Sequence, residues 1–390
     1  MSQRWLVAAA LFAVVFSASN QIAAFGVFLP ALADHFGWSR GAISVALSIS
    51  LLIGGFAGFA VGAIADRHGP RGILLLTVAI AGAGYALAST TGALWHLYVF
   101  VGVMGGLGTS GFYIIASTTV TRWFDRDRGL ALALVLVGFN VSFVTAGPAA
   151  AWLIERVGWR GAYLVFGGWL CVVGSLAALV VRDPPRQRVA PGPATLRDDH
   201  GVGVGEALRD RRLWLLLLSW FVLGAVLLMV TVHVVPYARD GGADLASAAL
   251  ALTAYGVGAA VGRLASGPLS DRLGPQPIMR ACFVLQVIAL VVLAFGPSLP
   301  LLLPMVAVFG LGFTGADTVY LRVIPDVFGL KALGAITGVL SMGWRAGAAL
   351  GPALAGFIHD ATGSYALPFG LAPVAVVVGY ALFAAGSKKP

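Results

Sequence analysis

The sequence predicts an all-α integral membrane protein with twelve transmembrane helices in two parallel six-helix repeats. Charged residues make up only 11% of the 390 residues and apolar residues 59%, with a mean hydropathy of +0.92, whereas an ordinary soluble domain carries roughly 25% charged residues. Because a spanning helix needs about 20 apolar residues, the chain is long enough for twelve spans and one longer loop. The long apolar runs exclude an outer-membrane barrel, whose short strands alternate in polarity.

Charged or Pro- and Gly-rich breaks separate the apolar runs. The spans are expected near 6–32, 41–65, 72–91, 94–121, 129–153, 161–181, 213–238, 245–270, 278–296, 299–323, 332–358 and 366–386. The first run resembles a signal peptide but continues to Leu32, so we expect an uncleaved span. Prolines and charges between the sixth and seventh spans predict a linker. We therefore expect an N-terminal bundle at 1–182, a cytoplasmic linker at 183–212 and a C-terminal bundle at 213–390.

Lysine and arginine are distributed unevenly between the two sides that these spans define. With a cytoplasmic N-terminus, nineteen of the 25 lie in cytoplasmic segments, two lie inside the membrane, and four lie outside: Arg40, Arg156, Arg160 and Arg239. Because cytoplasmic loops carry the excess of positive charge, we expect a multi-pass protein of the cell (inner) membrane with both termini in the cytoplasm. Topology thus accounts for the net charge of +9, and no nucleic-acid partner is expected.

Three segments of the first half recur in the second half at nearly constant spacing. Gly62-Ala-Ile-Ala-Asp66-Arg67-His-Gly69-Pro70 recurs 205 residues later as Gly267-Pro-Leu-Ser-Asp271-Arg272-Leu-Gly274-Pro275. The pattern Gly106/Gly108/Gly111 and the pair Gly147-Pro148 recur 204 residues later as Gly310/Gly312/Gly315 and Gly351-Pro352. Since each half holds an even number of spans, the halves are parallel repeats. This arrangement is typical of a transporter whose two bundles rock about a site at their interface.

No motif in the sequence indicates an enzyme. The two G-x-G-x-x-G patterns lie inside apolar spans with no preceding strand, so they fail as nucleotide-binding motifs and indicate close helix packing instead. Cys171 and Cys282 both lie in apolar runs and form no metal-binding pair. We therefore expect no enzymatic activity, no cofactor and no metal.

The repeated loops place an acid at the end of one helix and a basic residue beside a turn-forming glycine. One interpretation is an ion-paired gating latch that breaks as the bundles rock, and ordinary topology charge is the alternative. The candidate gating residues are Gly62, Asp66, Arg67, Gly69, Arg71, Gly267, Asp271, Arg272 and Gly274.

Three charged residues, Arg263, Asp317 and Arg345, lie in the interior of predicted spans, more than one turn from either end. An arginine or aspartate at a helix centre costs roughly 2.5–3.5 kcal/mol on insertion scales, so each implies a partner or a cavity. Two guanidinium groups and one carboxylate leave a net positive site, and a guanidinium binds a carboxylate bidentately. A small organic anion is therefore the expected substrate, while a structural ion-pair network is the alternative.

Weaker candidates are uncharged residues inside the spans. His233 is a candidate proton-coupling residue or gate, with a packing role as the alternative. Tyr113 and Tyr320 are candidate hydrogen-bond donors to the substrate, although a tyrosine packed between helices is the commoner case. Asn20 is a similar candidate in the first span.

The repeated loop is similar to the G-x-x-x-D-R-x-G-R-R signature of the major facilitator superfamily. Within that superfamily, Trp123-Phe124-Asp125-Arg126-Asp127-Arg128-Gly129-Leu130-Ala131 resembles the Y-F-x-K-R-x-x-L-A motif of the monocarboxylate transporters. The oxalate–formate antiporters are also similar. The resemblance implies that Arg263 is a substrate-binding arginine, that Arg345 takes the place of a helix 11 lysine, and that Tyr113 matches a helix 4 tyrosine of the site.

The sequence departs from those families at the proton relay. The first span lacks their acidic motif and lysine, and Ala259 stands where an acid is expected one turn before Arg263. Asp317 is the expected substitute, because when ionised it could pair with Arg263 or with Arg345, and when protonated it would release that arginine. We therefore expect a proton-coupled monocarboxylate transporter that works as a monomer in the lipid bilayer. The alternatives are an oxalate/formate-type dicarboxylate exchanger, a drug–proton antiporter of the same fold, and a non-transporting sensor.

Overall fold

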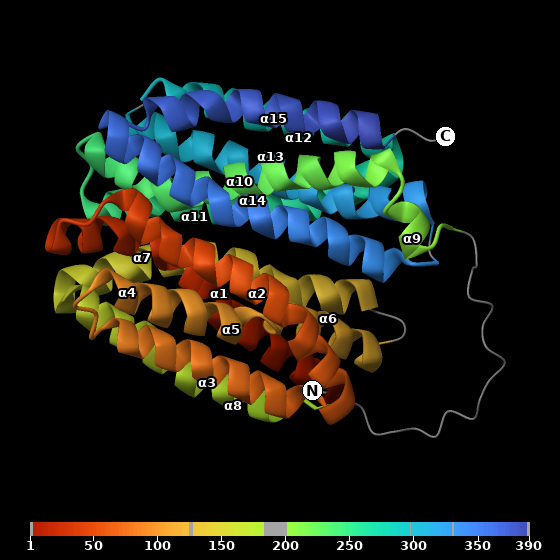
Figure 1. The fold of residues 1–390 in the computed structure, drawn as a ribbon, viewed down its shortest axis with the longest axis horizontal. Coiled ribbons are helices and arrows are strands. Elements are labelled where there is room, and N and C mark those ends of the chain that lie inside the picture. Colours follow the sequence, from red (N-terminus) through yellow and green to blue (C-terminus); the bar gives the residue numbers. More distant parts are fainter. Residues whose placement is uncertain (1–2, 125–127, 183–200, 297, 330, 388–390) are drawn as a thin grey trace.

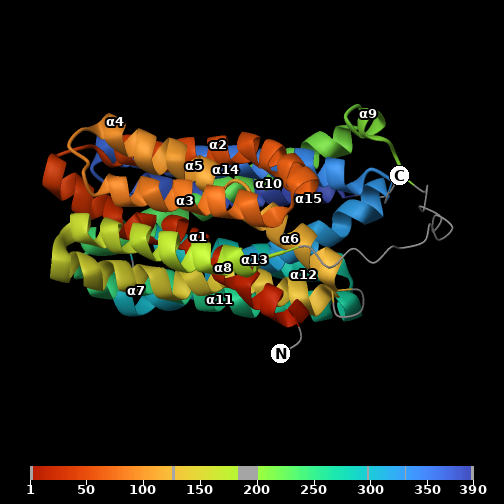
Figure 2. The same cartoon turned by 90° about the horizontal axis from the view of Figure 1, so that it is seen from below.

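The computed structural model describes residues 3–124, 128–182, 201–296, 298–329 and 331–387. In this part of the chain, two helical bundles lie side by side with their helices along the long axis of the molecule (Figure 1). The view turned by 90° shows the same elongated arrangement (Figure 2). The first and last helices begin and end on one side of the molecule, which we call the termini side. We call the opposite side the far side.

The N-terminal bundle contains the first six spans. Its helices are α1 (Gln3–Phe36), α2 (Arg40–His68), α3 (Pro70–Ala88), α4 (Leu94–Leu97), the π-helical η1 (Tyr98–Met104), α5 (Gly105–Thr109), α6 (Phe112–Trp123), α7 (Arg128–Trp169), the π-helical η2 (Leu170–Gly174) and α8 (Ser175–Val180). The fourth span is built from the four consecutive pieces α4 to α6. The helix α7 is broken at Gly158, where φ is 71°, so it contains the fifth span and the start of the sixth.

The C-terminal bundle contains the last six spans. Its helices are α10 (Arg211–Asp240), α11 (Leu245–Leu273), α12 (Pro275–Ala294), α13 (Leu299–Phe328), α14 (Leu333–Thr362) and α15 (Ala366–Gly386). The short helix α9 (Val204–Ala207) precedes them. Residues 183–200 of the expected linker lie outside the described residues. The remaining part of the linker includes α9 and the start of α10.

Ten helical stretches of the described residues are long and apolar enough to cross a membrane. One of them, Leu130–Val180, is 51 residues long and contains two spans because of the break at Gly158. The helix α14 has 30 residues, which is also sufficient to span the bilayer. The fold agrees with the expected twelve spans, and the chain is a multi-pass membrane protein.

The sequence repeat is also a repeat of backbone conformation. Gly69 ends α2 with φ 87° and ψ 159°, and Gly274 ends α11 with φ 86° and ψ 161°. In each copy the following proline, Pro70 or Pro275, is the first residue of the next helix. This left-handed conformation favours glycine, and proline suits the first helical position. The motif therefore encodes the same sharp helix-to-helix turn twice.

Glycines bring α11 and α13 into backbone contact. Gly258 lies against the backbone of Ala307, and Gly262 lies against the backbone of Leu311. From the opposite helix, Gly310 lies against the backbone of Tyr255. A side chain at any of these positions would overlap main-chain atoms of the partner helix. Small residues at helix interfaces allow such close approach in membrane proteins, so these glycines fix how the polar residues of the two helices face each other.

We predict that Gly258→Ala destabilises the protein, because the added methyl group would overlap the carbonyl oxygen of Ala307. Overpacking of this kind costs about 1–3 kcal/mol. The matched control is Gly370→Ala in α15, where no atom lies within 4 Å of the added carbon and alanine is the better helix former. Thermal unfolding in detergent is expected to show a lower midpoint for Gly258→Ala only. Equal midpoints for the two variants would contradict this packing.

Candidate functional site

Arg263 on α11 and Asp317 on α13 form an ion pair at the level of the membrane. The distance between Arg263 Nη2 and Asp317 Oδ2 is 3.5 Å, and the two side chains keep 26% and 20% of their surface accessible. The Nε–H of Arg263 is buried and has no hydrogen-bond partner among the described residues. One long contact therefore holds the pair, and a donor of the guanidinium remains unused.

Tyr113 brings the N-terminal bundle to this pair. It lies on α6, close enough to Arg263 and Asp317 to interact electrostatically with both. It keeps 41% of its surface accessible. Tyr113 is therefore an accessible side chain of the N-terminal bundle beside the two charges of the C-terminal bundle. The structure thus groups three of the residues that the sequence singled out.

Tyr320 does not join this group. Its side chain is fully buried, and its hydroxyl donates a hydrogen bond to the backbone carbonyl of Leu216 on α10. Its ring stacks on Trp220, with the ring centroids 4.9 Å apart. Trp220 itself lies close to the Asp317 carboxylate, and its buried indole N–H is unpaired within the described chain. Tyr320 thus packs α13 on α10, while Trp220, which the sequence analysis did not single out, lies beside the ion pair.

Arg345 lies apart from the Arg263–Asp317 pair. It projects from α14 of the C-terminal bundle onto the backbone of α2 in the N-terminal bundle. A Cβ added at Gly55 would lie 3.0 Å from Arg345 Cδ, and one added at Gly54 would lie 3.5 Å from Nη1. Arg345 forms no ion pair with a carboxylate in the described part of the chain. It is therefore an uncompensated positive charge at the bundle interface.

His233 and Asn20 are both buried. The Nδ1 and Nε2 atoms of His233 each lie 2.8 Å from an oxygen, the Tyr365 hydroxyl and the Pro352 carbonyl respectively. Because a carbonyl only accepts, Nε2 carries the proton and Nδ1 accepts from the tyrosine. The charges that act on His233 belong to residues of the far side, including Arg40 and Asp360. The Oδ1 atom of Asn20 has no partner among the residues described.

The candidate gating loops lie on the termini side, after α2 and after α11. In the second copy Asp271 pairs with Arg322 at the end of α13, which ties two helices of the same bundle together. The side chain of Asp66, its counterpart in the first copy, lies outside the described residues. Residues 125–127 of the loop before the fifth span lie outside them as well. Beside this loop, the indole N–H of Trp123 donates to the carbonyl of Arg182 at 2.7 Å.

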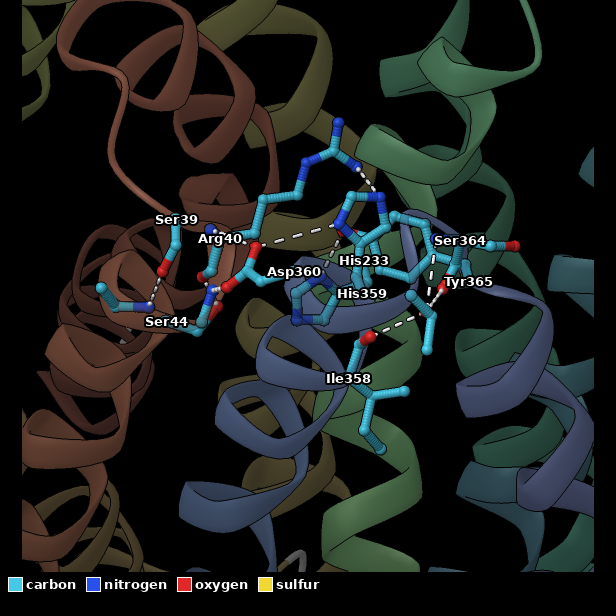
Figure 3. Close-up of polar contacts among 12 residues, drawn as sticks. Ser39, Arg40, Ser44, His233, Ile358, His359, Asp360, Ser364 and Tyr365 are labelled. Atoms are coloured by element: carbon cyan, nitrogen blue, oxygen red, sulfur yellow. Dashed lines mark hydrogen bonds and ion pairs between the residues drawn. The ribbon is translucent and has the colours of Figure 1, made fainter.

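A cluster of charged residues joins the two bundles on the far side. Arg40, the first residue of α2, forms a bidentate ion pair with Asp240 at the end of α10, with N–O distances of 2.6 and 2.7 Å. The backbone N–H groups of Arg40 and Gly41 donate to the carboxylate of Asp360 on α14, at 2.9 and 2.8 Å (Figure 3). A carboxylate at a helix N-terminus is favourable, and this one comes from the opposite bundle.

His359 and Tyr365 complete this cluster. His359 Nε2 lies 3.3 Å from Arg40 Nη1 and 3.4 Å from an Asp240 carboxylate oxygen. The Arg40 guanidinium lies over the ring of Tyr365, 5.3 Å from its centroid. Figure 3 shows Arg40 of α2 next to His359, Asp360 and Tyr365 of the opposite bundle. We call Arg40, Asp240, His359, Asp360 and Tyr365 the far-side latch.

Other contacts between the bundles also lie toward the far side. The Ser48 hydroxyl of α2 donates to the Ala349 carbonyl of α14, and the Thr253 hydroxyl of α11 donates to the Val144 carbonyl of α7 at 2.9 Å. Gly26 of α1 lies against the backbone of Val232 on α10. The bundles are thus closed against each other at the far side, while the ion pair near Tyr113 remains accessible.

In the sequence, Arg40 is only one of four positive charges expected outside the membrane. The available signal was the presence of acids at helix ends on that same side, since Asp240 and Asp360 both lie near the ends of predicted spans. Sequence spacing does not tell which of these ends meet across the bundles. The latch therefore became visible only in three dimensions.

Comparison with known proteins assigns a class to this arrangement. The chain belongs to the Major Facilitator Superfamily, whose family description matches residues 11–242 and 234–390. Its members are transporters and not enzymes. The chain is similar to human Monocarboxylate transporter 11, with 30% identity over 395 residues covering 96% of this chain and 81% of the relative. It is 28% identical over 406 residues to Monocarboxylate transporter 13 of Bos taurus, covering 99% and 92%.

Solved structures share the fold at lower identity. A bacterial homolog of the human lysosomal transporter Spinster, in an inward-facing and unoccupied conformation, matches with a TM-score of 0.79 and 18% identity over 99% of this chain and 94% of that one. A point mutant of the nucleoside transporter NupG matches with a TM-score of 0.79 and 12% identity over 97% and 99%. The expected two-bundle fold is confirmed.

We predict that Arg40→Gln opens the far side, because it removes the bidentate pair across the bundles. The pair is partly exposed, so its loss is expected to favour the open state by about 1 kcal/mol, or about fivefold. Spin labels at Thr90→Cys and Ala246→Cys, one on each bundle in a background without native cysteines, would report the distance between the two bundles at the far side. The control Arg239→Gln breaks the weaker pair with Asp34, 3.4 Å long. Unchanged distances in Arg40→Gln would refute the latch.

Proposed function

We propose that the chain is a secondary active transporter that moves a small monocarboxylate, such as lactate or pyruvate, across the cytoplasmic membrane by alternating access and with coupling to protons. The observation that carries this proposal is the state of Arg263, which has one long contact to Asp317 and an unused Nε–H. A carboxylate that replaced Asp317 on Nη2 and reached Nε, once a shift of the helices uncovers it, would satisfy both donors in the bidentate geometry that guanidinium favours. The similarity to proteins named monocarboxylate transporters supports the same substrate class.

Proton coupling follows from competition for Arg263. The ionised Asp317 occupies the guanidinium and opposes substrate binding. Protonation of Asp317 weakens its hold and frees the guanidinium for the substrate carboxylate. Binding of substrate and binding of a proton then favour each other, which is the requirement for symport. His233 remains a second candidate for proton coupling, through its hydrogen bond to Tyr365 of the far-side latch.

The remaining contacts support a site shared by both bundles. Tyr113 from the N-terminal bundle is placed to donate a hydrogen bond to a substrate held by Arg263. Arg345 adds positive potential at the interface. Asn20 offers a buried carbonyl oxygen without a partner among the described residues, an acceptor that would bind a substrate hydroxyl, such as that of lactate, and not the carboxylate. Tyr320 would contact substrate only if α10 and α13 separated. A site formed by two bundles is the arrangement that alternating access requires.

We assign the termini side to the cytoplasm, from the excess of arginine and lysine in its loops. The far-side latch then closes the pathway to the outside, and the site communicates with the cytoplasm. In this assignment the repeated loops with Asp66 and Asp271 lie at the cytoplasmic ends of the bundles. They would form the latch of the opposite state, in which the far side opens. The proposed transporter works as a monomer.

The second candidate is exchange of dicarboxylates of the oxalate/formate type. Arg345 favours it, because an arginine without a carboxylate partner in the described chain could bind a second carboxylate at the interface. A drug–proton antiporter of the same fold finds less support, since Arg263, Asp317 and Arg345 together carry a net positive charge that would repel a cationic drug.

We predict that Arg263→Ala abolishes uptake of radiolabelled monocarboxylate into proteoliposomes. Loss of a bidentate charge-assisted pair costs about 3 kcal/mol, or about 100-fold in transport efficiency. Arg263→Lys is expected to retain a small part of the uptake, because an ammonium group cannot reproduce the bidentate geometry of the guanidinium. Arg209→Ala removes an exposed arginine far from the site and serves as the control. Normal uptake by folded Arg263→Ala, judged by monodisperse elution, would overturn the carboxylate site.

Asp317→Asn is expected to uncouple transport from protons. The amide is permanently neutral, so substrate uptake is predicted to persist under exchange conditions while an inward proton gradient no longer increases it. The measurement compares lactate, pyruvate, acetate and oxalate uptake with and without the gradient, in wild type and variant. An undiminished response of Asp317→Asn to the gradient would exclude Asp317 as the coupling group. Oxalate uptake that requires preloaded counter-anion would favour the exchanger instead.

A further inference from the structure

A groove on the outer surface of the C-terminal bundle lies between α12 and α15, away from the candidate transport site. Its volume is about 400 Å³. It is lined by Arg280, Phe283, Val284, Val287, Ile288, Val377 and Tyr380. Five of these seven side chains are aliphatic or phenyl groups, and the only charge is that of Arg280. The groove is therefore an apolar surface groove with one positively charged residue, Arg280, in its lining.

The apolar part of the groove faces outward. Val284, Ile288 and Val377 expose 56%, 50% and 54% of their surfaces. In a protein that spans the membrane, these surfaces contact lipid rather than water. The order of residues along α12 shows which end of the groove is polar and which is apolar. Arg280 lies near the start of α12, and the apolar residues follow toward the far side.

Arg280 and Tyr380 form the polar end of the groove. Arg280 Nε donates to the Tyr380 hydroxyl oxygen at 3.1 Å. This bond leaves the two Nη groups of Arg280 and the hydroxyl proton of Tyr380 as donors. Arg280 makes no ion pair within the described part of the chain. Three donor groups thus remain at this cationic end of the groove, and none of them binds an acidic side chain of the described residues.

The depth of this corner matches a lipid headgroup. Arg280 is five residues from Pro275, the first residue of α12 on the termini side, which corresponds to about 7.5 Å along the helix axis. At that depth an arginine extends its charge to the membrane interface while its stem stays among apolar groups. Tyrosine also prefers this level of the bilayer.

We propose that this groove binds one anionic phospholipid of the leaflet on the termini side, such as phosphatidylglycerol. Its phosphate accepts from the Nη groups of Arg280 and from the Tyr380 hydroxyl, and one acyl chain lies along Val284, Ile288 and Val377. Basic pockets between transmembrane helices bind anionic headgroups in this way. A free inorganic anion would bind the Arg280 guanidinium but would make none of the apolar contacts. A zwitterionic lipid would make the apolar contacts, but its own ammonium group would compete with Arg280 for its phosphate.

The test is native mass spectrometry of the full chain, delipidated in a neutral detergent and titrated with phosphatidylglycerol or phosphatidylcholine of identical acyl chains. Wild type is expected to retain one phosphatidylglycerol that Arg280→Gln loses, with an affinity lower by about fivefold or more. Arg209→Gln removes one exposed positive charge of the termini side outside the groove and is expected to bind like wild type. Inorganic phosphate is expected not to displace the lipid.

Two further variants separate headgroup recognition from a general loss of structure. Tyr380→Phe keeps the ring but removes the donor, so it is expected to weaken phosphatidylglycerol binding without lowering the unfolding temperature of the lipid-free protein. Ile288→Trp fills the groove and is expected to prevent retention of the lipid while Arg280 is intact. Equal retention of both lipids by wild type, displacement by phosphate alone, or wild-type binding by Arg280→Gln would each overturn the site.

Discussion

The ion pair between Arg263 and Asp317 is the interaction on which the rest of the site depends. A single charge at this depth is costly, and each of these two groups reduces the cost of the other. The pair forms because glycines let α11 and α13 approach until their backbones touch, with Gly262 directly before Arg263. Its contact is nevertheless single and 3.5 Å long. The packing of α11 against α13, more than the ion pair, therefore holds the two helices together. The Arg263 guanidinium can then exchange Asp317 for another carboxylate without loss of this packing.

Most of the fold could be predicted from the sequence, because lipid imposes one length and one polarity on every spanning helix. The repeated turn at Gly69 and Gly274 was predictable for a further reason, since glycine with a following proline encodes both its backbone conformation and the start of the next helix. The division of the fourth span into α-helical and π-helical pieces was not predictable. Hydropathy does not detect a change in the hydrogen-bond register of an apolar helix.

The candidate site was predicted in part. Charged residues inside spans are rare because placing a charge in the membrane is energetically costly, and this alone identified Arg263 and Asp317. The sequence left open whether Asp317 would pair with Arg263 or with Arg345. The structure pairs it with Arg263. Tyr113 and Tyr320 looked equivalent because both are tyrosines in matching spans, yet the first keeps 41% of its surface accessible while the second packs against Trp220. The contacts of an aromatic ring depend on helix rotation, which one sequence does not fix.

Alternation between two states requires that neither state be much more stable than the other. The far-side latch meets this requirement because its ion-paired side chains, Arg40 and Asp240, keep 18% and 39% of their surface accessible, and such pairs contribute only modestly. Its position adds a physical link to the site. Trp220, close to Asp317, and Asp240, in the latch, belong to the same helix α10. They are twenty positions apart, which corresponds to about 30 Å along the helix. A change at Asp317 that shifts Trp220 would tilt α10 and displace Asp240 from Arg40. The contacts of α10 at Trp220 and at Asp240 would in this way link the site to the latch.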